Sequence, residues 1–185
     1  MLPLFAERLV LRRFAPADLE PFLAYRNDPD VARYQSWEGI SRTEAEAFIR
    51  SQETQEPLTP GEWIQIAIAL RESGVLLGDL GLHVQDPESR QATVGVTLAR
   101  PHQGQGYASE ALVCLLDHLF QQRHLHRVVA DTDPRNVPAW MLLERLGMRR
   151  EGHLRQSLRF KGQWVDEYLY AILGDEWLAR QVQQT

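Results

Sequence analysis

The stretch "LARPHQGQGYASEAL", Leu98–Leu112, joins a segment with the pattern of a β-strand to one with the pattern of a helix. Two glycines, Gly104 and Gly106, stand in the connection. Such a connection is either a plain turn or a cradle for phosphate, because free amides and the positive end of a helix attract anions. Which of the two it is decides most of what the sequence says about function.

The loop satisfies one of three phosphate-binding patterns. A P-loop requires GxxxxGK[ST], and the stretch has neither that lysine nor that glycine spacing. A dinucleotide fingerprint requires a third glycine, but Ser109 stands there. The remaining pattern, Q/R-x-x-G-x-G/A, fits residues 103–108. Its small residues let main-chain amides approach a diphosphate without any lysine, and a bare turn is the alternative interpretation.

Hydrophobic periodicity predicts the elements around this loop. Strands are predicted at residues 8–13, 63–70, 75–84, 91–99, 127–132, 149–160 and 164–173, and helices at 15–28, 41–52, 107–123, 136–148 and 175–184. Ser41 or Thr43 is the expected N-cap of the second helix. Gly78 and Gly81 lie inside a strand and indicate a bulge or a close neighbour.

This order of elements predicts one α+β domain over residues 1–185. Three consecutive strands linked by short turns form an antiparallel meander, and the later strands close with a hairpin. A chain of 185 residues with 44% hydrophobic content is long enough for one filled core and too short for two domains. We therefore expect a central, mostly antiparallel mixed sheet flanked by helices.

Composition excludes several classes of protein. The net charge is −5 with no basic stripe, which argues against a nucleic-acid partner. No apolar run approaches the roughly 20 residues of a membrane span, and "MLPLFAERLV" lacks the features of a signal peptide. Cys114 is the single cysteine, which fits a cytoplasmic location. His124 and His126 have no third ligand of suitable type nearby, so no metal is expected.

Several stretches together resemble the GNAT acetyltransferase superfamily. "VGVTLARPHQGQGYASEAL" (94–112) is similar to its strand–loop–helix unit for acetyl-CoA, and "NVPAWMLLERLGMRREG" (136–152) to its second signature. The opening "ERLVLRRFAPADLEPFLAYRNDPDVARY" (7–34) and the closing "GQWVDEYLYAIL" (162–173) resemble the RimJ/RimL-like branch, the N-terminal acetyltransferases of ribosomal proteins and their relatives. The resemblance covers nearly the full chain and implies a GNAT-like three-layer fold.

The resemblance also implies where acetyl-CoA binds. The strand before the loop splays from its neighbour, the pantetheine arm pairs with its exposed backbone, and the loop amides hold the diphosphate. Asn136 matches the asparagine that meets the pantetheine or the acetyl end, with an N-cap or Asx-turn as the alternative. The implied cofactor-binding residues are Val96, Thr97, Leu98, Gln103, Gly104, Gln105, Gly106, Tyr107, Ala108, Ser109 and Asn136.

The catalytic residues are less well defined. Many family members donate a proton to the thiolate from a tyrosine where this chain has Leu143, and the RimL-like pattern has serine where Ala139 stands. No catalytic acid can be carried over, so Ser109, Tyr107 or water are substitutes. Candidates for the general base by placement alone are Glu151, His153 and His83, each with a structural or solvated role as the alternative.

The predicted reaction is direct attack of an amine on the acetyl thioester. An α-amine, with a pKa of about 7.7–8, needs a weaker base than a lysine near 10.4. A protein N-terminus is the expected acceptor, and a polyamine or aminoglycoside is the alternative. A further alternative is a non-catalytic acyl-CoA-binding module. Tyr34 and Trp37 are predicted to wall the acceptor site, unless they pack in the core. No membrane partner is expected, and a homodimer is left open.

Overall fold

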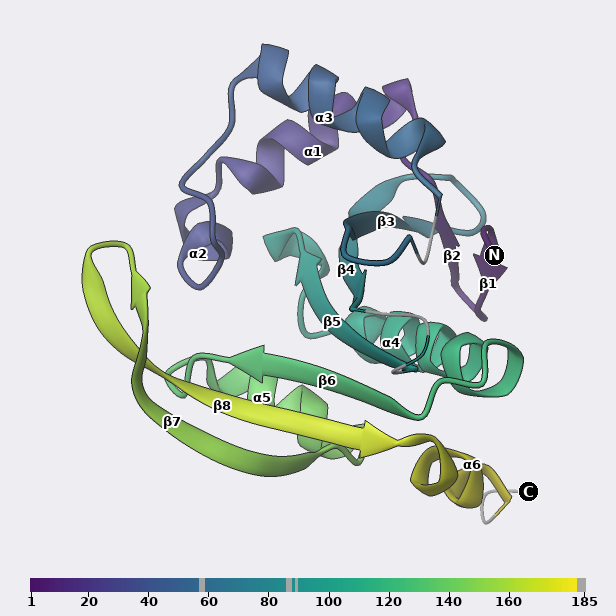
Figure 1. The fold of residues 1–185 in the computed structure, drawn as a ribbon. Coiled ribbons are helices and arrows are strands. Elements are labelled where there is room, and N and C mark those ends of the chain that lie inside the picture. Colours follow the sequence, from purple (N-terminus) through teal and green to yellow (C-terminus); the bar gives the residue numbers. More distant parts are fainter. Residues whose placement is uncertain (57–58, 86–87, 89, 183–185) are drawn as a thin grey trace.

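The computed structural model describes residues 1–56, 59–85, 88 and 90–182. Its centre is an eight-stranded sheet with the order β1-β2-β3-β4-β5-β6-β8-β7 (Figure 1). The strands are β1 (Leu4–Phe5), β2 (Leu9–Arg12), β3 (Trp63–Leu70), β4 (Leu76–Val84), β5 (Gln91–Leu98), β6 (Arg127–Thr132), β7 (Arg149–Phe160) and β8 (Gln163–Leu173). Among these strands, as far as the chain is described, only β5 and β6 pair in parallel, which confirms the predicted mixed, mostly antiparallel sheet.

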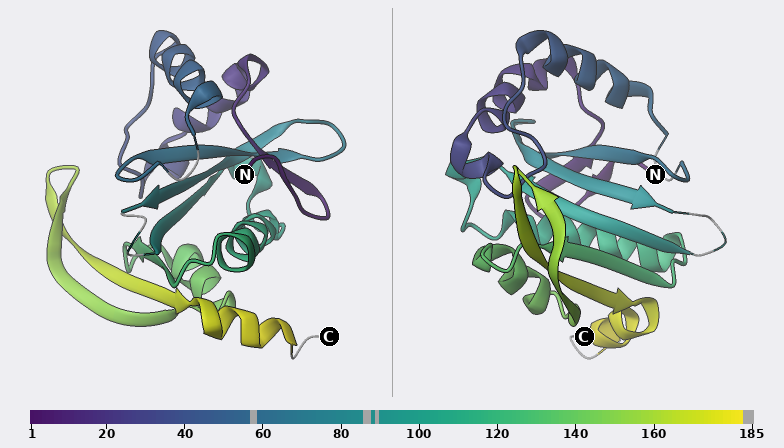
Figure 2. Two further views of the ribbon diagram at one scale, coloured as in Figure 1. Left: turned by 45° about the vertical axis from the view of Figure 1, so that its right-hand side comes forward. Right: turned by 60° about the vertical axis from the view of Figure 1, so that its left-hand side comes forward.

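Helices cover both faces of this sheet (Figure 2). They are η1 (Pro16–Asp18), α1 (Leu19–Arg26), α2 (Pro29–Ala32), α3 (Arg42–Thr54), η2 (Arg100–His102), α4 (Tyr107–Asp117), η3 (His118–Gln122), α5 (Val137–Arg145) and α6 (Gly174–Val182). Alternation along β3 explains the layers, because Ile66 and Ile68 pack in the larger core with α4, whereas Ala67 packs in a smaller core with Phe22 of α1 and Ile49 of α3. The result is the expected three-layer α+β fold.

Four elements differ from the sequence prediction. The helix predicted to run to residue 123 ends as α4 at Asp117 and continues as a π-helical turn, η3. The wider turn lets the consecutive side chains of Leu119 and Phe120 both reach the core. The short elements β1 and α2 were not predicted, because each is too brief to show a period. The last helix begins at Gly174, and residues 183–184 of its predicted range lie outside the described residues.

The N-terminus of α3 is closed by Ser41 rather than Thr43. The Ser41 Oγ accepts a hydrogen bond from the Glu44 amide at 3.3 Å, and the Glu44 carboxylate accepts one from the Ser41 amide at 2.9 Å. This reciprocal pair is a capping box. It satisfies two amides that the helix itself leaves unpaired.

Replacing Ser41 with alanine is expected to lower the free energy of unfolding by about 1 kcal/mol, the usual loss for an N-cap. Thr43 lies exposed inside the first turn of the same helix. Thr43→Ala is therefore the matched control and should leave stability within about 0.5 kcal/mol of wild type. Chemical denaturation of both variants measures the difference, and equal midpoints would show that Ser41 is not the cap.

Candidate active site

The parallel pair β5 and β6 separates partway along its length. Register pairs join only Gln91–Thr93 to Arg127–Val129, and beyond them the two strands diverge toward α2 (Figure 1). From Val94 to Leu98, β5 is paired on its β4 side alone within the described chain. On the other side the Leu98 carbonyl accepts a hydrogen bond from the Gln103 side chain. The main-chain groups before it are open to an extended ligand, which can add to them as a strand does. Three predicted residues, Val96, Thr97 and Leu98, lie in this separated segment.

The loop between β5 and α4 presents unbonded amides. Gly104 and Gly106 both have left-handed φ angles, +72° and +83°, and Gly106 is the N-cap of α4. Within the described residues, none of the amides from Gly104 to Ser109 donates a hydrogen bond. The amide of Gln103 is different, because it donates to the Arg100 carbonyl at 3.2 Å. Six free amides at a helix N-terminus suit an anion such as a diphosphate.

The two glutamines of the loop brace it from within. The Gln103 side chain donates to the Leu98 carbonyl at 2.9 Å, and the Gln105 side chain donates to the Pro101 carbonyl at 2.7 Å. Both side chains therefore fix the course of the loop. Because these side chains are already hydrogen-bonded, the main chain of the loop is the part that is available to a ligand.

Asp131 is a functional candidate that the sequence analysis missed. It lies on β6 two residues beyond Val129, the last residue paired with β5. By register it shares the sheet face of Thr97, and Glu167 of β8 lies on that face beside it. Asp131 is exposed to solvent at its strand position, although its surroundings still reduce the hydration of the carboxylate. This loss of hydration, and then the charge of Glu167, raise the pKa of Asp131. A lone carboxylate near the end of the apolar strand "RVVADT" is the signal that could have revealed it.

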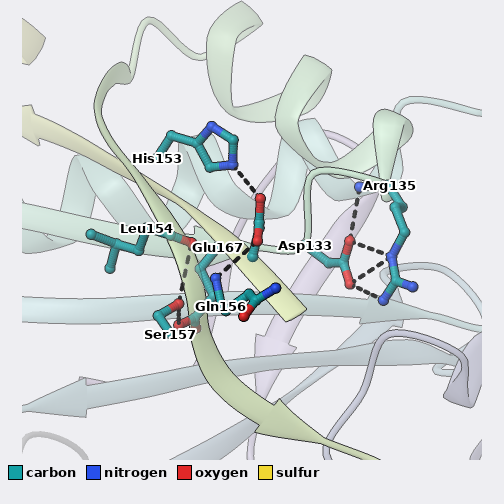
Figure 3. A network of polar contacts seen from close by, with 8 residues as sticks. Asp133, Arg135, His153, Leu154, Gln156, Ser157 and Glu167 are labelled. Atoms are coloured by element: carbon teal, nitrogen blue, oxygen red, sulfur yellow. Dashed lines mark hydrogen bonds and ion pairs between the residues drawn. The ribbon is translucent and has the colours of Figure 1, made fainter. Parts of the chain in front are cut away.

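Asp131 differs from Glu151 and Asp133, each of which is paired with an arginine. Within the described residues, no arginine, lysine or histidine forms an ion pair with Asp131 or Glu167. The Glu167 carboxylate accepts a hydrogen bond from Ser157 Oγ at 2.6 Å (Figure 3). This face of the separated strands is therefore negatively charged and attracts a cationic group such as an ammonium.

The predicted acceptor residues Tyr34 and Trp37 have different positions. The Tyr34 hydroxyl donates to the Arg135 carbonyl at 3.3 Å, just before α5. The Trp37 ring is half-buried and stacks on the guanidinium of Arg26, with 3.7 Å from the Arg26 Cζ to the ring centroid. Trp37 therefore lies against α1, outside both core clusters of the described residues. Tyr34 lies where the chain after α2 meets the β6–α5 connection.

The tip of the β7–β8 hairpin closes on α2. Lys161 Nζ donates to the Ala32 carbonyl at 2.8 Å. In Figure 1 the hairpin tip and α2 both lie at the end of the sheet toward which β5 and β6 diverge. The hairpin and α2 therefore flank the separated strands.

A second polar cluster lies after the end of β6 (Figure 3). His153 Nε2 is 2.6 Å from Asp166 Oδ2, and the Gln156 amide donates to Asp166 Oδ1 at 2.9 Å. The Gln156 amide, and then His153, lower the pKa of Asp166. Arg135, which donates from its Nε to Asp133 at 2.9 Å, lowers the pKa of Asp133. With Pro134, Trp164 and Val165 these side chains line a cavity of about 240 Å³. The carboxylates of Asp133 and Asp166 in this cavity thus already have partners within the protein.

The remaining predicted residues are scattered. Glu151 forms a bidentate ion pair with Arg127, which lowers the pKa of Glu151 and weakens it as a base. His83 stacks on Trp63 with ring centroids 5.2 Å apart, and its strand position pairs with Thr93, before the strands separate. The structure therefore brings neither Glu151 nor His83 to the loop.

Ser109 and Asn136 each lie at the start of a helix. Ser109 is in the first turn of α4, directly after the loop. Asn136 precedes α5, and its side chain makes no capping hydrogen bond.

No group of three or more metal-binding side chains occurs in the part of the chain that is described. In that same part, no helix combines the length and apolar character that crossing a membrane requires.

Comparisons with known proteins agree on one family. Residues 8–149 match the family described as acetyltransferase (GNAT) domain. The chain is 31% identical over 174 residues to the uncharacterized N-acetyltransferase p20 of Bacillus licheniformis, covering 94% of this chain and 97% of that protein. A GNAT-family acetyltransferase structure from Bacillus anthracis superposes with a TM-score of 0.84 at 29% identity, covering 95% and 100% of the two chains. A shorter match, 33% over 84 residues, is to the Escherichia coli ribosomal protein uS5-alanine N-acetyltransferase, covering 45% of this chain and 43% of that protein.

Proposed function

Because this chain belongs to the GNAT acetyltransferase family, we propose that it transfers an acetyl group from acetyl-CoA to the α-amine of a protein N-terminus. Its activity as an N-acetyltransferase follows from the family and from its relatives. The observation that carries the proposal is the separation of β5 from β6 beside a loop of six free amides. This combination offers an open strand edge for the pantetheine arm and an anion site for the diphosphate.

The residues present fit such a ligand. The left-handed φ of Gly104 and Gly106 exposes the amides, and neither glycine has a side chain to obstruct a diphosphate. The open amides of β5 near Thr97 would polarise the thioester carbonyl as an oxyanion hole does. Acetyl-CoA supplies the activated acetyl group. Asn136 is available at the start of α5 to hydrogen-bond the arm.

Asp131 is the residue that we assign to the acceptor amine. Its carboxylate would hold the ammonium and accept its proton, directly or through water, so that the nitrogen lone pair attacks the acetyl carbon. The C–N bond forms, the C–S bond breaks, and a proton reaches the departing thiolate. An α-amine gives up its proton more readily than a lysine, so a carboxylate is a sufficient base for it. The match to an alanine N-acetyltransferase supports the α-amine as acceptor.

A thiol-release assay tests this proposal. Purified protein with acetyl-CoA is offered peptides with different N-terminal residues, and in parallel spermidine and an aminoglycoside. We expect release with a subset of the peptides and a product acetylated at the α-amine by mass spectrometry. Release with the small amines alone would overturn the choice of acceptor. Binding of acetyl-CoA with no transfer to any acceptor would instead indicate an acyl-CoA-binding module.

A further inference from the structure

Arg8, just before β2, makes several contacts with the loop and with α4. Its main-chain amide and its Nε both donate to the Glu110 carboxylate, each at 2.7 Å. Its guanidinium donates to the Gln105 carbonyl at 3.2 Å and lies 4.5 Å above the Tyr107 ring centroid. The bond to Glu110, the largest influence, raises the pKa of Arg8. One side chain thus ties the N-terminal segment to a loop almost a hundred residues later in the chain.

If the loop binds an anion, the negative charge of Glu110 has to be neutralised, and the contact with Arg8 does this. Glu110 lies in the first turn of α4, where a carboxylate stabilises the helix by opposing its dipole. The same negative charge would repel a diphosphate at that helix end. The Glu110 side chain is 17% exposed, so water screens its charge only in part. Arg8 is the cation that pairs with it.

The position of Arg8 is also suited to shaping the loop. A Cβ placed on Gly106 would lie 3.3 Å from the second guanidinium nitrogen of Arg8, so this group sits against the main chain of the loop. Arg8, Gly106, Ser109 and Glu110 together line one end of an open cavity of about 930 Å³ between β1 and α4. By holding the Gln105 carbonyl, Arg8 leaves the adjacent amides free to face a ligand.

We propose that Arg8 is a positioning residue of the acetyl-CoA site, which neutralises Glu110 and holds the Gln105 carbonyl so that the loop amides meet the diphosphate. The inference rests on the proposed function. It assigns a role to a residue outside the strand–loop–helix unit and explains how a loop without lysine tolerates a carboxylate beside it. Arg8 acts through Gln105 and Glu110 and touches no reacting atom.

A double-mutant cycle, measured with two different acetyl donors, tests this role. Arg8→Ala is expected to raise KM for acetyl-CoA about tenfold, the scale of one charged contact, and to leave kcat within about twofold. With acetyl-pantetheine, which lacks the diphosphate, KM should not change. Glu110→Gln alone should have little effect. The double variant Arg8→Ala with Glu110→Gln should recover most of the lost affinity, because the repelling charge is gone.

Two further variants distinguish this role from a general loss of structure in the N-terminal segment. Arg71→Ala is the matched control, since Arg71 also braces the N-terminal segment, through the Ala6 carbonyl, but does not touch the loop. Arg8→Lys retains the charge without the forked contacts and should lie between wild type and Arg8→Ala.

The outcomes distinguish the inference from its premise. Equal loss of affinity in the single and double variants would overturn the neutralisation of Glu110 by Arg8. An equal loss with acetyl-pantetheine would overturn the role of Arg8 at the diphosphate altogether. Failure of the wild-type protein to bind acetyl-CoA would overturn both the proposed function and this inference. Normal wild-type binding with an unaffected Arg8→Ala variant would overturn the inference alone.

Discussion

Replacing Gly78 with alanine is expected to destabilise this protein by about 3 kcal/mol or more, the upper end of the cost of overpacking. A Cβ at Gly78 would lie 2.0 Å from the Thr97 carbonyl oxygen and 2.8 Å from the Leu98 Cα. Both atoms belong to the main chain, so no side-chain rotation can relieve the clash. The strands β4 and β5 would have to move apart, next to the point where the register of β3 and β4 already shifts after Ile68.

Gly95→Ala provides the control for this prediction. Gly95 lies on β5 and pairs with Gly81 of β4, and no heavy atom lies within 4 Å of the place that a Cβ would take there. It also lacks a left-handed φ. Thermal and urea denaturation should therefore show a large loss for Gly78→Ala and a loss below about 1 kcal/mol for Gly95→Ala. Similar midpoints for Gly78→Ala and wild type would mean that β4 and β5 can separate at this point at little cost.

Gly78 also shows what the sequence can predict. An isolated glycine inside an alternating strand indicates a close neighbour, and the structure confirms one. The strand at 63–70 matches β3 residue for residue, because its alternation of isoleucines leaves one register for the buried face. The loop at 103–108 could be predicted because its glycines are close together in the chain. Patterns of this kind involve residues that are close in sequence, so they can be recognised without knowledge of the tertiary structure.

Contacts between distant segments leave no such local pattern. The parallel pairing of β5 with β6 stops after Thr93 because of how two strands far apart in sequence meet, so only the family resemblance suggested the separation. Arg8 and Glu110 each look like an ordinary surface charge until the fold joins them. Glu151 was a reasonable candidate base by placement, but its ion pair with Arg127 depends on how β6, β7 and β8 are paired. Which carboxylate is paired with a cation, and is therefore a weaker candidate for the base, could be seen only in the structure.

Asp131→Asn is the variant with the largest expected effect on activity. If Asp131 holds the acceptor ammonium and takes its proton, its replacement should lower kcat about 100-fold or more, the usual contribution of a general base. Asparagine has the same shape but no charge and cannot accept the proton. The amides of the loop are on another element, so KM for acetyl-CoA should stay within about twofold of wild type.

Glu151→Gln is the matched control, because it also neutralises a carboxylate of the same sheet but one whose pKa is lowered by Arg127. It should retain kcat within about twofold, since Arg127 already holds this group, whereas no cation of the described residues pairs with Asp131. Steady-state kinetics with a peptide acceptor compare the two variants, and calorimetry with acetyl-CoA checks that binding is intact. A large loss in Glu151→Gln with Asp131→Asn active would transfer the role to Glu151. The difference between the two carboxylates then rests on one physical fact, that a base must be free of the cation that would otherwise hold its charge.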